Sequence, residues 1–142
     1  RVVAVDRSPA ALAIAARNAA ALGAAVELIE SDWFAALGGR QFDIIVGNPP
    51  YVAAADPHLA QGDVRFEPAS ALAAGPDGLA DLRRLIATAP GHLHPGGFLL
   101  LEHGYDQAPA VRTLLETHGF RQIAHWKDLA GIDRVTGGKL SE

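Results

Sequence analysis

Four consecutive residues, Asn48, Pro49, Pro50 and Tyr51, have the types and spacing with the clearest chemistry in this sequence. The Asn48 side chain and the stiff Pro49 backbone each offer a carbonyl oxygen that can accept from an NH₂ group. Pro50 keeps the residue before it extended, and Tyr51 offers a flat ring that can fix the plane of a bound group. A nitrogen conjugated with a π system is a poor nucleophile, so orienting its lone pair is what a site can contribute. The run therefore predicts a site that positions a planar NH₂ for one-step, in-line transfer.

A plain turn after a strand is the simpler interpretation of the same run, because Asn and Pro are common turn residues. Two prolines and an aromatic residue directly after Asn exceed what an ordinary turn requires. Finding Asn48 and Tyr51 in the core rather than at a cleft would favour the simpler interpretation, and with it a non-catalytic α/β fragment or binding module.

These residues must be held by the strands and helices that the apolar pattern predicts. Strands are expected at 2–5, 25–31, 42–47, 96–104, 120–126 and 132–135, and helices at 8–23, 79–90 and 107–119. The alternation predicts an α/β fold with a mostly parallel sheet covered on both faces, and the last two strands predict a C-terminal antiparallel hairpin. Ligands of such sheets gather at the carboxyl ends of the strands, where Asp6, Asp32, Asn48 and Glu102 are expected.

Composition narrows the classes of function. The chain has 142 residues, 49% of them hydrophobic, with 12 basic and 16 acidic residues and a net charge of −4. This balance speaks against direct nucleic-acid binding, which draws its affinity from Lys and Arg. No Cys is present, so thiolate metal sites and disulfides are excluded, and no apolar run is long enough to span a membrane. We expect a cytoplasmic protein without membrane contact.

Two further polar pairs are weaker signals. His92 and His94 are spaced as metal ligands can be, but no third ligand stands near them, so no metal site is expected. Glu102 and His103 could suggest acid–base catalysis, although a carboxylate at a strand end more often supports packing or a neighbouring loop.

The "NPPY" run resembles the motif of S-adenosylmethionine-dependent methyltransferases that act on amide or adenine nitrogens. The segments "VAVDRSPAALAIAARNA", "ESDWFAAL", "DPHLAQGDVRFEPASAL", "GGFLLLEHG" and "DLAGIDRVTGG" are similar to the peptide chain release factor glutamine methyltransferases, over essentially the whole chain. The resemblance implies a Rossmann-like methyltransferase fold with S-adenosyl-L-methionine as cofactor. It implies that Asp6 binds the ribose hydroxyls and that Asp32 and Trp33 border the adenine. Asn48 would contact both cofactor and substrate, and Pro49, Pro50 and Tyr51 would surround the substrate glutamine.

The chain departs from that family at its start. The glycine-rich cofactor loop and the strand before it, expected upstream of Val2, are absent, as is the amino-terminal helical domain. In this fold the missing strand lies between the strands at 2–5 and 42–47. We therefore expect residues 1–142 to be a partial catalytic domain with two unpaired strand edges there, open to pairing with another chain. We also expect this chain alone to bind the methyl donor poorly and to be inactive.

The resemblance predicts N5-methylation of a glutamine in a peptide chain release factor. Alternatives are an adenine-N6 methyltransferase on DNA or RNA, an enzyme that modifies a ribosomal-protein glutamine, and a catalytically inert fragment. The acidic balance argues against the nucleic-acid alternative, unless another domain supplies the positive charge.

Overall fold

The computed structural model describes residues 1–52 and 74–141, and the chain divides into two compact units, 1–40 and 41–142. Each unit is described by itself below. In the described residues, no helix combines the length and the apolar character that crossing a membrane requires.

The first unit is a parallel β-α-β arrangement, as the sequence predicts. Strand β1 (Val2–Asp6) pairs in parallel with β2 (Val26–Glu30), and helix α1 (Pro9–Leu22) connects them. The Ser8 hydroxyl caps the helix by accepting from the Ala11 N–H at 3.3 Å. Gly23 ends it in the left-handed conformation, with φ +62°.

The second unit contains a four-stranded sheet in the order β3-β4-β6-β5. Its strands are β3 (Phe42–Gly47), β4 (Leu93–Glu102), β5 (Phe120–Lys127) and β6 (Asp133–Leu140). β3 and β4 are parallel, whereas β6 runs antiparallel to both β4 and β5, so the C-terminal antiparallel hairpin is confirmed. The parallel β3–β4 pair brings the carboxyl ends of both strands to the same edge, which is where ligands of such sheets bind.

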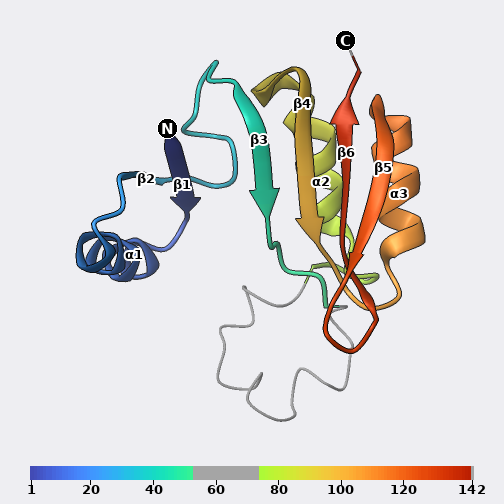
Figure 1. Ribbon diagram of the computed structural model, residues 1–142, viewed down its shortest axis with the longest axis horizontal. Helices are drawn as coiled ribbons and strands as arrows, with labels where there is room; N and C mark the ends of the chain where they lie inside the picture. Colours follow the sequence, from blue (N-terminus) through green and yellow to red (C-terminus); the bar gives the residue numbers. More distant parts are fainter. Residues whose placement is uncertain (53–73, 142) are drawn as a thin grey trace. The chain divides into compact units, whose positions relative to one another are not determined.

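One face of this sheet is covered by two helices, α2 (Ala80–Thr88) and α3 (Ala108–Thr117), which lie behind the strands in Figure 1. A short 3-10 helix, η4 (Ala89–His92), connects α2 to β4. The core lies between sheet and helices and includes Leu82, Ile86, Leu99, Leu101, Val111, Leu115 and Phe120. Leu82, Leu85 and Ile86 are the residues that α2 buries in this core.

On the opposite face of the four-stranded sheet, the described residues of the second unit place no helix. Ile44, Val46, Phe98 and Trp126 project from it with exposed fractions of 58%, 76%, 42% and 47%. Both helices of this unit pack against the other face. Strand–helix alternation predicts layers, but it does not predict on which side each helix lies.

Two strands are longer than predicted. β4 begins at Leu93 rather than Gly96, so His94 belongs to the strand, and β6 continues to Leu140 instead of ending at Val135. Gly137 and Gly138 lie inside β6, close to the neighbouring strands: an added Cβ on Gly137 would stand 2.7 Å from the Leu99 oxygen. A glycine inside a strand weakens it, so the pair Gly137-Gly138 does not predict that the strand continues through it.

Each unit contains its own sheet: β1 pairs with β2 in the first unit, and β3 pairs with β4 in the second. The predicted gap between β1 and β3 stays a prediction. β1 is also less buried than its apolar run predicts, with Val2 58% exposed. An unpaired strand edge is open to association, and pairing with another chain stays a prediction.

Candidate active site

The Asn48–Tyr51 segment leaves the sheet at the carboxyl end of β3. The Asn48 side chain is exposed, Pro49 is fully buried, and Pro50 and Tyr51 are half-buried. Buried Pro49 anchors the segment, so the Asn48 side chain stands free of the core at the strand end. The inert-fragment alternative would be favoured by an Asn48 side chain in the core, whereas this side chain is exposed.

The Tyr51 backbone is held by a glutamine far along the chain. Gln107 Nε2 donates to the Tyr51 carbonyl at 2.9 Å, and Gln107 Oε1 accepts from the Gly104 N–H at 2.8 Å. Gln107 is only 9% exposed and directly precedes α3. Both polar atoms of one buried amide therefore connect the loop after β3 to the loop after β4.

The Tyr51 ring is held at its other end. Its hydroxyl donates to Glu102 Oε1 at 3.3 Å, a long contact for an O–H···O hydrogen bond. Glu102 is the last residue of β4, and thus the Glu102 carboxylate supports the loop after the neighbouring strand. The expectation that this carboxylate supports a neighbouring loop is confirmed.

Gly78 lies against the same carbonyl. A Cβ added to Gly78 would stand 2.4 Å from the Tyr51 oxygen and 2.8 Å from Gln107 Nε2, and the residue has φ +72°. Only glycine allows this backbone conformation and this close approach together. The Tyr51 carbonyl is thus enclosed by the Gln107 amide and the Gly78 backbone.

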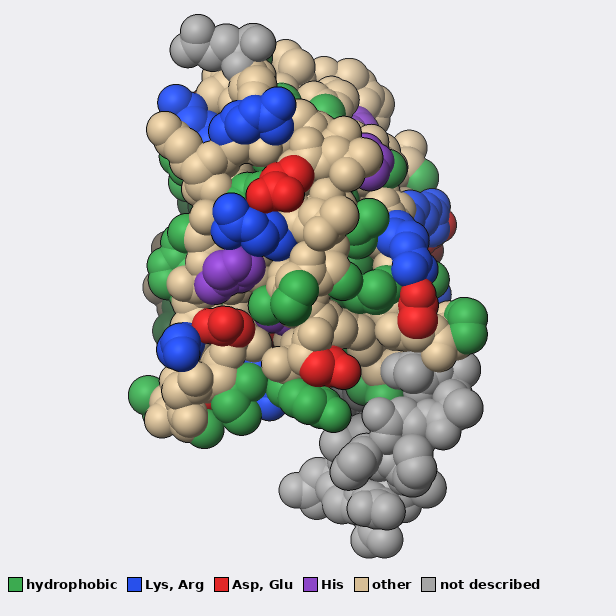
Figure 2. Space-filling view, turned by 90° about the vertical axis from the view of Figure 1, so that its right-hand side faces the viewer, with side chains coloured by type: hydrophobic (Ala, Val, Ile, Leu, Met, Phe, Trp, Pro, Cys, Tyr) green, Lys and Arg blue, Asp and Glu red, His purple; other side chains and the backbone are tan. Residues whose placement is uncertain are grey.

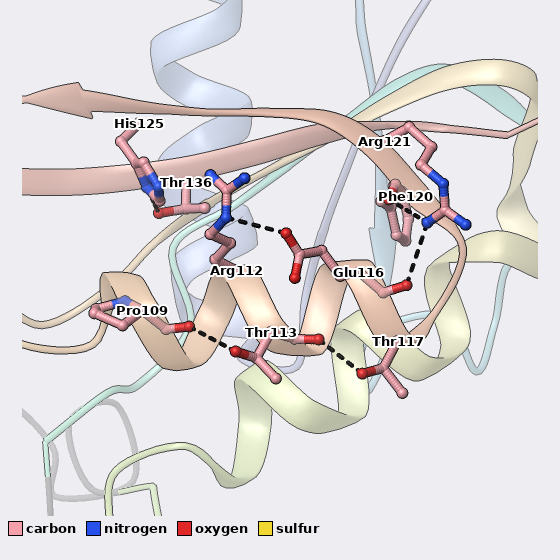
Figure 3. A network of polar contacts seen from close by, with 9 residues as sticks. All are labelled: Pro109, Arg112, Thr113, Glu116, Thr117, Phe120, Arg121, His125 and Thr136. Atoms are coloured by element: carbon pink, nitrogen blue, oxygen red, sulfur yellow. Dashed lines mark hydrogen bonds and ion pairs between the residues drawn. The ribbon is translucent and has the colours of Figure 1, made fainter.

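A buried hydrogen-bond chain stabilises the end of β4 beneath this site. His103 is fully buried, and its Nδ1 donates to the Gly104 carbonyl at 2.8 Å, since a carbonyl oxygen only accepts. In the neutral ring, Nε2 then accepts from the Thr136 hydroxyl at 2.7 Å, and His125 Nδ1 donates to the Thr136 oxygen at 2.8 Å. Figure 3 shows His125 and Thr136 facing one another beside α3. His103 therefore has a structural role.

The first unit carries the other group of predicted site residues at the ends of β1 and β2. Asp6 Oδ1 accepts from the Ser8 N–H at 2.7 Å, and the Asp6 carbonyl accepts from the Ser31 N–H at 3.0 Å. Ser31, 6% exposed, donates to the Trp33 carbonyl at 2.8 Å and accepts from the Ala36 N–H at 3.0 Å. This buried hydroxyl holds the turn in which Trp33 adopts φ +54°.

An open hollow of about 340 Å³ lies beside this turn. It is lined by Arg7, Glu30, Ser31, Asp32, Ala35 and Ala36. Its lining combines apolar Ala surface with carboxylate acceptors, which suits a ligand that carries N–H or O–H donors on a flat or cyclic group.

Several surface carboxylates have a lowered pKa. The guanidinium of Arg83 and the Leu79 N–H lower the pKa of Asp77, the residue before Gly78. Arg40 and Arg1 lower the pKa of Glu27 on β2, and the Ile132 N–H and Arg134 lower that of Asp128. Asp77 therefore stays charged at neutral pH and holds the start of α2 through its contact with Leu79, at 3.1 Å.

On the molecular face in Figure 2, charged side chains of both signs are interspersed, and the described residues there form no continuous basic stripe. The ion pair between Arg112 and Glu116, at 3.0 Å, is one such pair on the exposed side of α3 (Figure 3). Within the part of the chain that the structure describes, no group of three or more His, Cys, Asp or Glu side chains could hold a metal ion.

The predicted site residues thus fall into two groups. Asp6, Asp32 and Trp33 come together in the first unit, and Asn48, Pro49, Pro50 and Tyr51 in the second. Glu67 and Pro68 of the "RFEP" segment lie outside the described residues.

Sequence reasoning missed Gln107, Gly78 and Ser31. Gln107 stands three residues after Gly104, and Gly78 closes a Gly-Pro-Asp-Gly run. Both patterns indicate a turn, but neither indicates which residue the turn contacts.

Comparisons with known proteins show which family this chain is similar to. The profile of the family described as "Methyltransferase small domain" matches residues 1–72. A release factor glutamine methyltransferase of Xylella fastidiosa is 59% identical over 140 residues, which are 98% of this chain and 51% of that protein. The namesake from Pseudomonas aeruginosa is 56% identical over 97% of this chain and 50% of its own length. The chain therefore spans about half the length of the curated relatives that it matches.

Solved structures show the same similarity. The release-factor-specific protein-(glutamine-N5) methyltransferase of Alicyclobacillus acidocaldarius aligns over all of this chain and 80% of its own, with 31% identity and a TM-score of 0.53. A methyltransferase of Pyrococcus furiosus aligns over all of this chain and 64% of its own, with a TM-score of 0.73. At 18% identity, the latter speaks for the fold alone.

Proposed function

We propose a function on the premise that this chain belongs to the methyltransferase small domain family and, within it, to the release factor glutamine methyltransferases. The protein that contains it transfers a methyl group from S-adenosyl-L-methionine to the side-chain nitrogen N5 of a glutamine in a peptide chain release factor. Such a substrate belongs to translation, and the protein accordingly acts in the cytoplasm.

The residues of the first unit fit this cofactor. S-adenosyl-L-methionine supplies an electrophilic methyl group on a sulfonium centre. Its ribose and adenine carry hydroxyl and amino donors, which match the carboxylates of Asp6 and Asp32. Trp33 supplies apolar surface for the adenine, and the hollow beside Asp32 has room for a ring.

The residues of the second unit orient the acceptor nitrogen. The exposed Asn48 side-chain oxygen accepts from one N–H group of the glutamine amide. The Pro49 carbonyl is assigned the other N–H group, which requires substrate binding to expose this carbonyl, because Pro49 is fully buried here. Tyr51 stacks on the amide plane. Two acceptors in the plane leave the nitrogen lone pair directed out of it, toward the incoming methyl group. The amide proton leaves to solvent after transfer, so no strong base is needed at the site.

The observation that carries the proposal is the strand-end arrangement of an exposed Asn48 directly before a fully buried Pro49. An anchored proline with an exposed amide beside it fixes one acceptor without burying it. A plain turn has no need of this combination.

Methyl transfer in the full-length protein tests the proposal. With labelled S-adenosyl-L-methionine and a release factor as substrate, we expect one methyl group per chain on a glutamine side chain, located by mass spectrometry of peptides. Asn48→Ala lowers kcat on the order of 100-fold because the amide loses one of its two acceptors. Asn18→Ala, at an exposed position of α1, is the matched control and keeps kcat.

Each alternative gives a different result. Methyl transfer to adenine in DNA or RNA but not to the release factor would overturn the proposal, as would transfer to a ribosomal-protein glutamine instead. Wild-type kcat in Asn48→Ala would remove the assigned role of Asn48.

A further inference from the structure

We propose that Gln107 is a positioning residue of the methyl-transfer site, which fixes the direction of Tyr51 by binding its backbone carbonyl. The proposal rests on the function inferred above, because Tyr51 is there assigned to the substrate amide. Gln107 itself contacts neither substrate nor cofactor in this role.

The Gln107 amide uses both of its polar atoms in the contact. Nε2 donates to the Tyr51 carbonyl at 2.9 Å while Oε1 accepts from the Gly104 N–H at 2.8 Å. Both distances are normal for N–H···O hydrogen bonds. A side chain held by two such bonds, with 9% of it exposed, has little rotational freedom.

The Gln107 backbone is fixed as well. Its N–H donates to the Gly104 carbonyl at 3.1 Å, and its own carbonyl accepts from the Val111 N–H at 3.0 Å in the first turn of α3. Because α3 packs on the core through Val111 and Leu115, both 0% exposed, the amide projects from a rigid element. Through Gln107, the position of Tyr51 is therefore fixed relative to the core.

These contacts determine which part of Tyr51 can face a substrate, the backbone carbonyl or the aromatic ring. The carbonyl is engaged by Gln107 and enclosed by Gly78, which leaves the aromatic ring as the part of Tyr51 that can face a substrate. The hydroxyl contact with Glu102, at 3.3 Å, then restricts rotation of the ring as a weaker second support. Gln is suited to the task because Asn is shorter by one methylene and Glu lacks the donor.

Two substitutions separate the two hydrogen bonds. Gln107→Glu keeps an acceptor for the Gly104 N–H but places a carboxylate oxygen against the Tyr51 carbonyl. Gln107→Ala removes both partners. In the full-length protein we expect both variants to lower kcat/KM for the release factor by about 10- to 100-fold, because misplacement of a positioning group is costly. The Kd for S-adenosyl-L-methionine, measured by calorimetry, should change less than twofold.

A pH profile distinguishes positioning from mere loss of stability. A protonated carboxyl can donate to the Tyr51 carbonyl as the amide did, so the activity of Gln107→Glu relative to wild type should rise as the pH is lowered. The ratio of Gln107→Ala to wild type should stay flat. Taking ratios to wild type removes the titrations that both proteins share.

A readout independent of activity keeps the inference separable from the proposed function. In amide exchange followed by NMR, the Gly104 N–H should remain protected in Gln107→Glu and lose protection in Gln107→Ala. Wild-type activity in both variants would overturn the positioning role. Inactivity of the wild-type protein on any glutamine would instead overturn the proposed function, while unchanged Gly104 exchange in Gln107→Ala would refute the contact itself.

Discussion

Gly78 lies against the backbone carbonyl of Tyr51 so closely that a Cβ on Gly78 would stand 2.4 Å from that oxygen. The two residues flank the segment 53–73, yet their backbones meet beside Gln107. Any side chain at position 78 must therefore displace either the Tyr51 carbonyl or the Gln107 amide.

Gly78→Ala is expected to reduce turnover through this contact. Gly75→Ala is a matched control, because Gly75 has nearly the same φ, +74° against +72°, but a Cβ there would meet only Ala80, at 3.2 Å. Both variants should lose roughly 1–2 kcal/mol of stability from the positive φ. The kcat of Gly78→Ala in the methylation assay should fall about tenfold below that of Gly75→Ala, since only Gly78 displaces Tyr51. Equal kcat values in the two variants would contradict the contact.

Ser31→Ala should destabilise the turn that carries Asp32 and Trp33. The buried hydroxyl makes two hydrogen bonds, and its removal leaves the Trp33 carbonyl and Ala36 N–H without that partner. We expect a loss of about 1–3 kcal/mol in the free energy of unfolding, measured in urea, and a weaker Kd for S-adenosyl-L-methionine. Ser141→Ala, which removes an exposed hydroxyl bound to the Gly119 carbonyl, serves as control and should change stability by less than about 0.5 kcal/mol. A cofactor Kd unchanged in Ser31→Ala would argue against a role of this turn in binding.

Thr136→Val should destabilise β6, the strand that lies between β4 and β5. Val has nearly the same shape but leaves the Nε2 of buried His103 without its partner, at a cost of about 1–3 kcal/mol in thermal or urea unfolding. Thr136→Ser keeps the hydroxyl and should retain most of the stability. Thr113→Val is the control on the exposed side of α3, where the hydroxyl bonds only to the Pro109 carbonyl (Figure 3). If Thr136→Val unfolds at the wild-type midpoint, the buried chain contributes nothing.

The turn between β5 and β6 should weaken in acid through Asp128. The Ile132 N–H and Arg134 lower its pKa in the folded protein below the ordinary value of 3.8. A lowered folded pKa gives stabilisation that is complete above the unfolded pKa and lost as the pH falls through the folded pKa. The difference in Tm between wild type and Asp128→Asn should therefore be constant from about pH 7 to 5 and shrink below about pH 4. A difference that grows toward acid pH would have the wrong sign.

Local patterns in the sequence predicted most elements of the fold. The helix expected at 8–23, the strand before Asn48 and the C-terminal hairpin all depend on residues close together in the chain, and all are present. The same locality made the Asn48–Tyr51 run recognisable, because its chemistry resides in four adjacent residues.

β4 begins earlier and β6 ends later than the sequence predicts, because the glycines near these positions indicate a strand end. Gly137 lies inside β6 because a neighbouring strand passes too close for a side chain, which depends on the Leu99 backbone. Apolar alternation likewise cannot specify on which face of the sheet α2 and α3 pack.

The sequence alone indicated the kind of chemistry. It places an amide side chain, two prolines and a tyrosine at a strand end, which suits binding and orienting a planar nitrogen. The tertiary structure alone decided how Tyr51 is held, since Gln107, Gly78 and Glu102 reach it from distant positions in the chain. Their polar contacts depend on where folded backbones come within about 3 Å of each other. No local pattern encodes that meeting, because each partner taken by itself is an ordinary loop or strand-end residue.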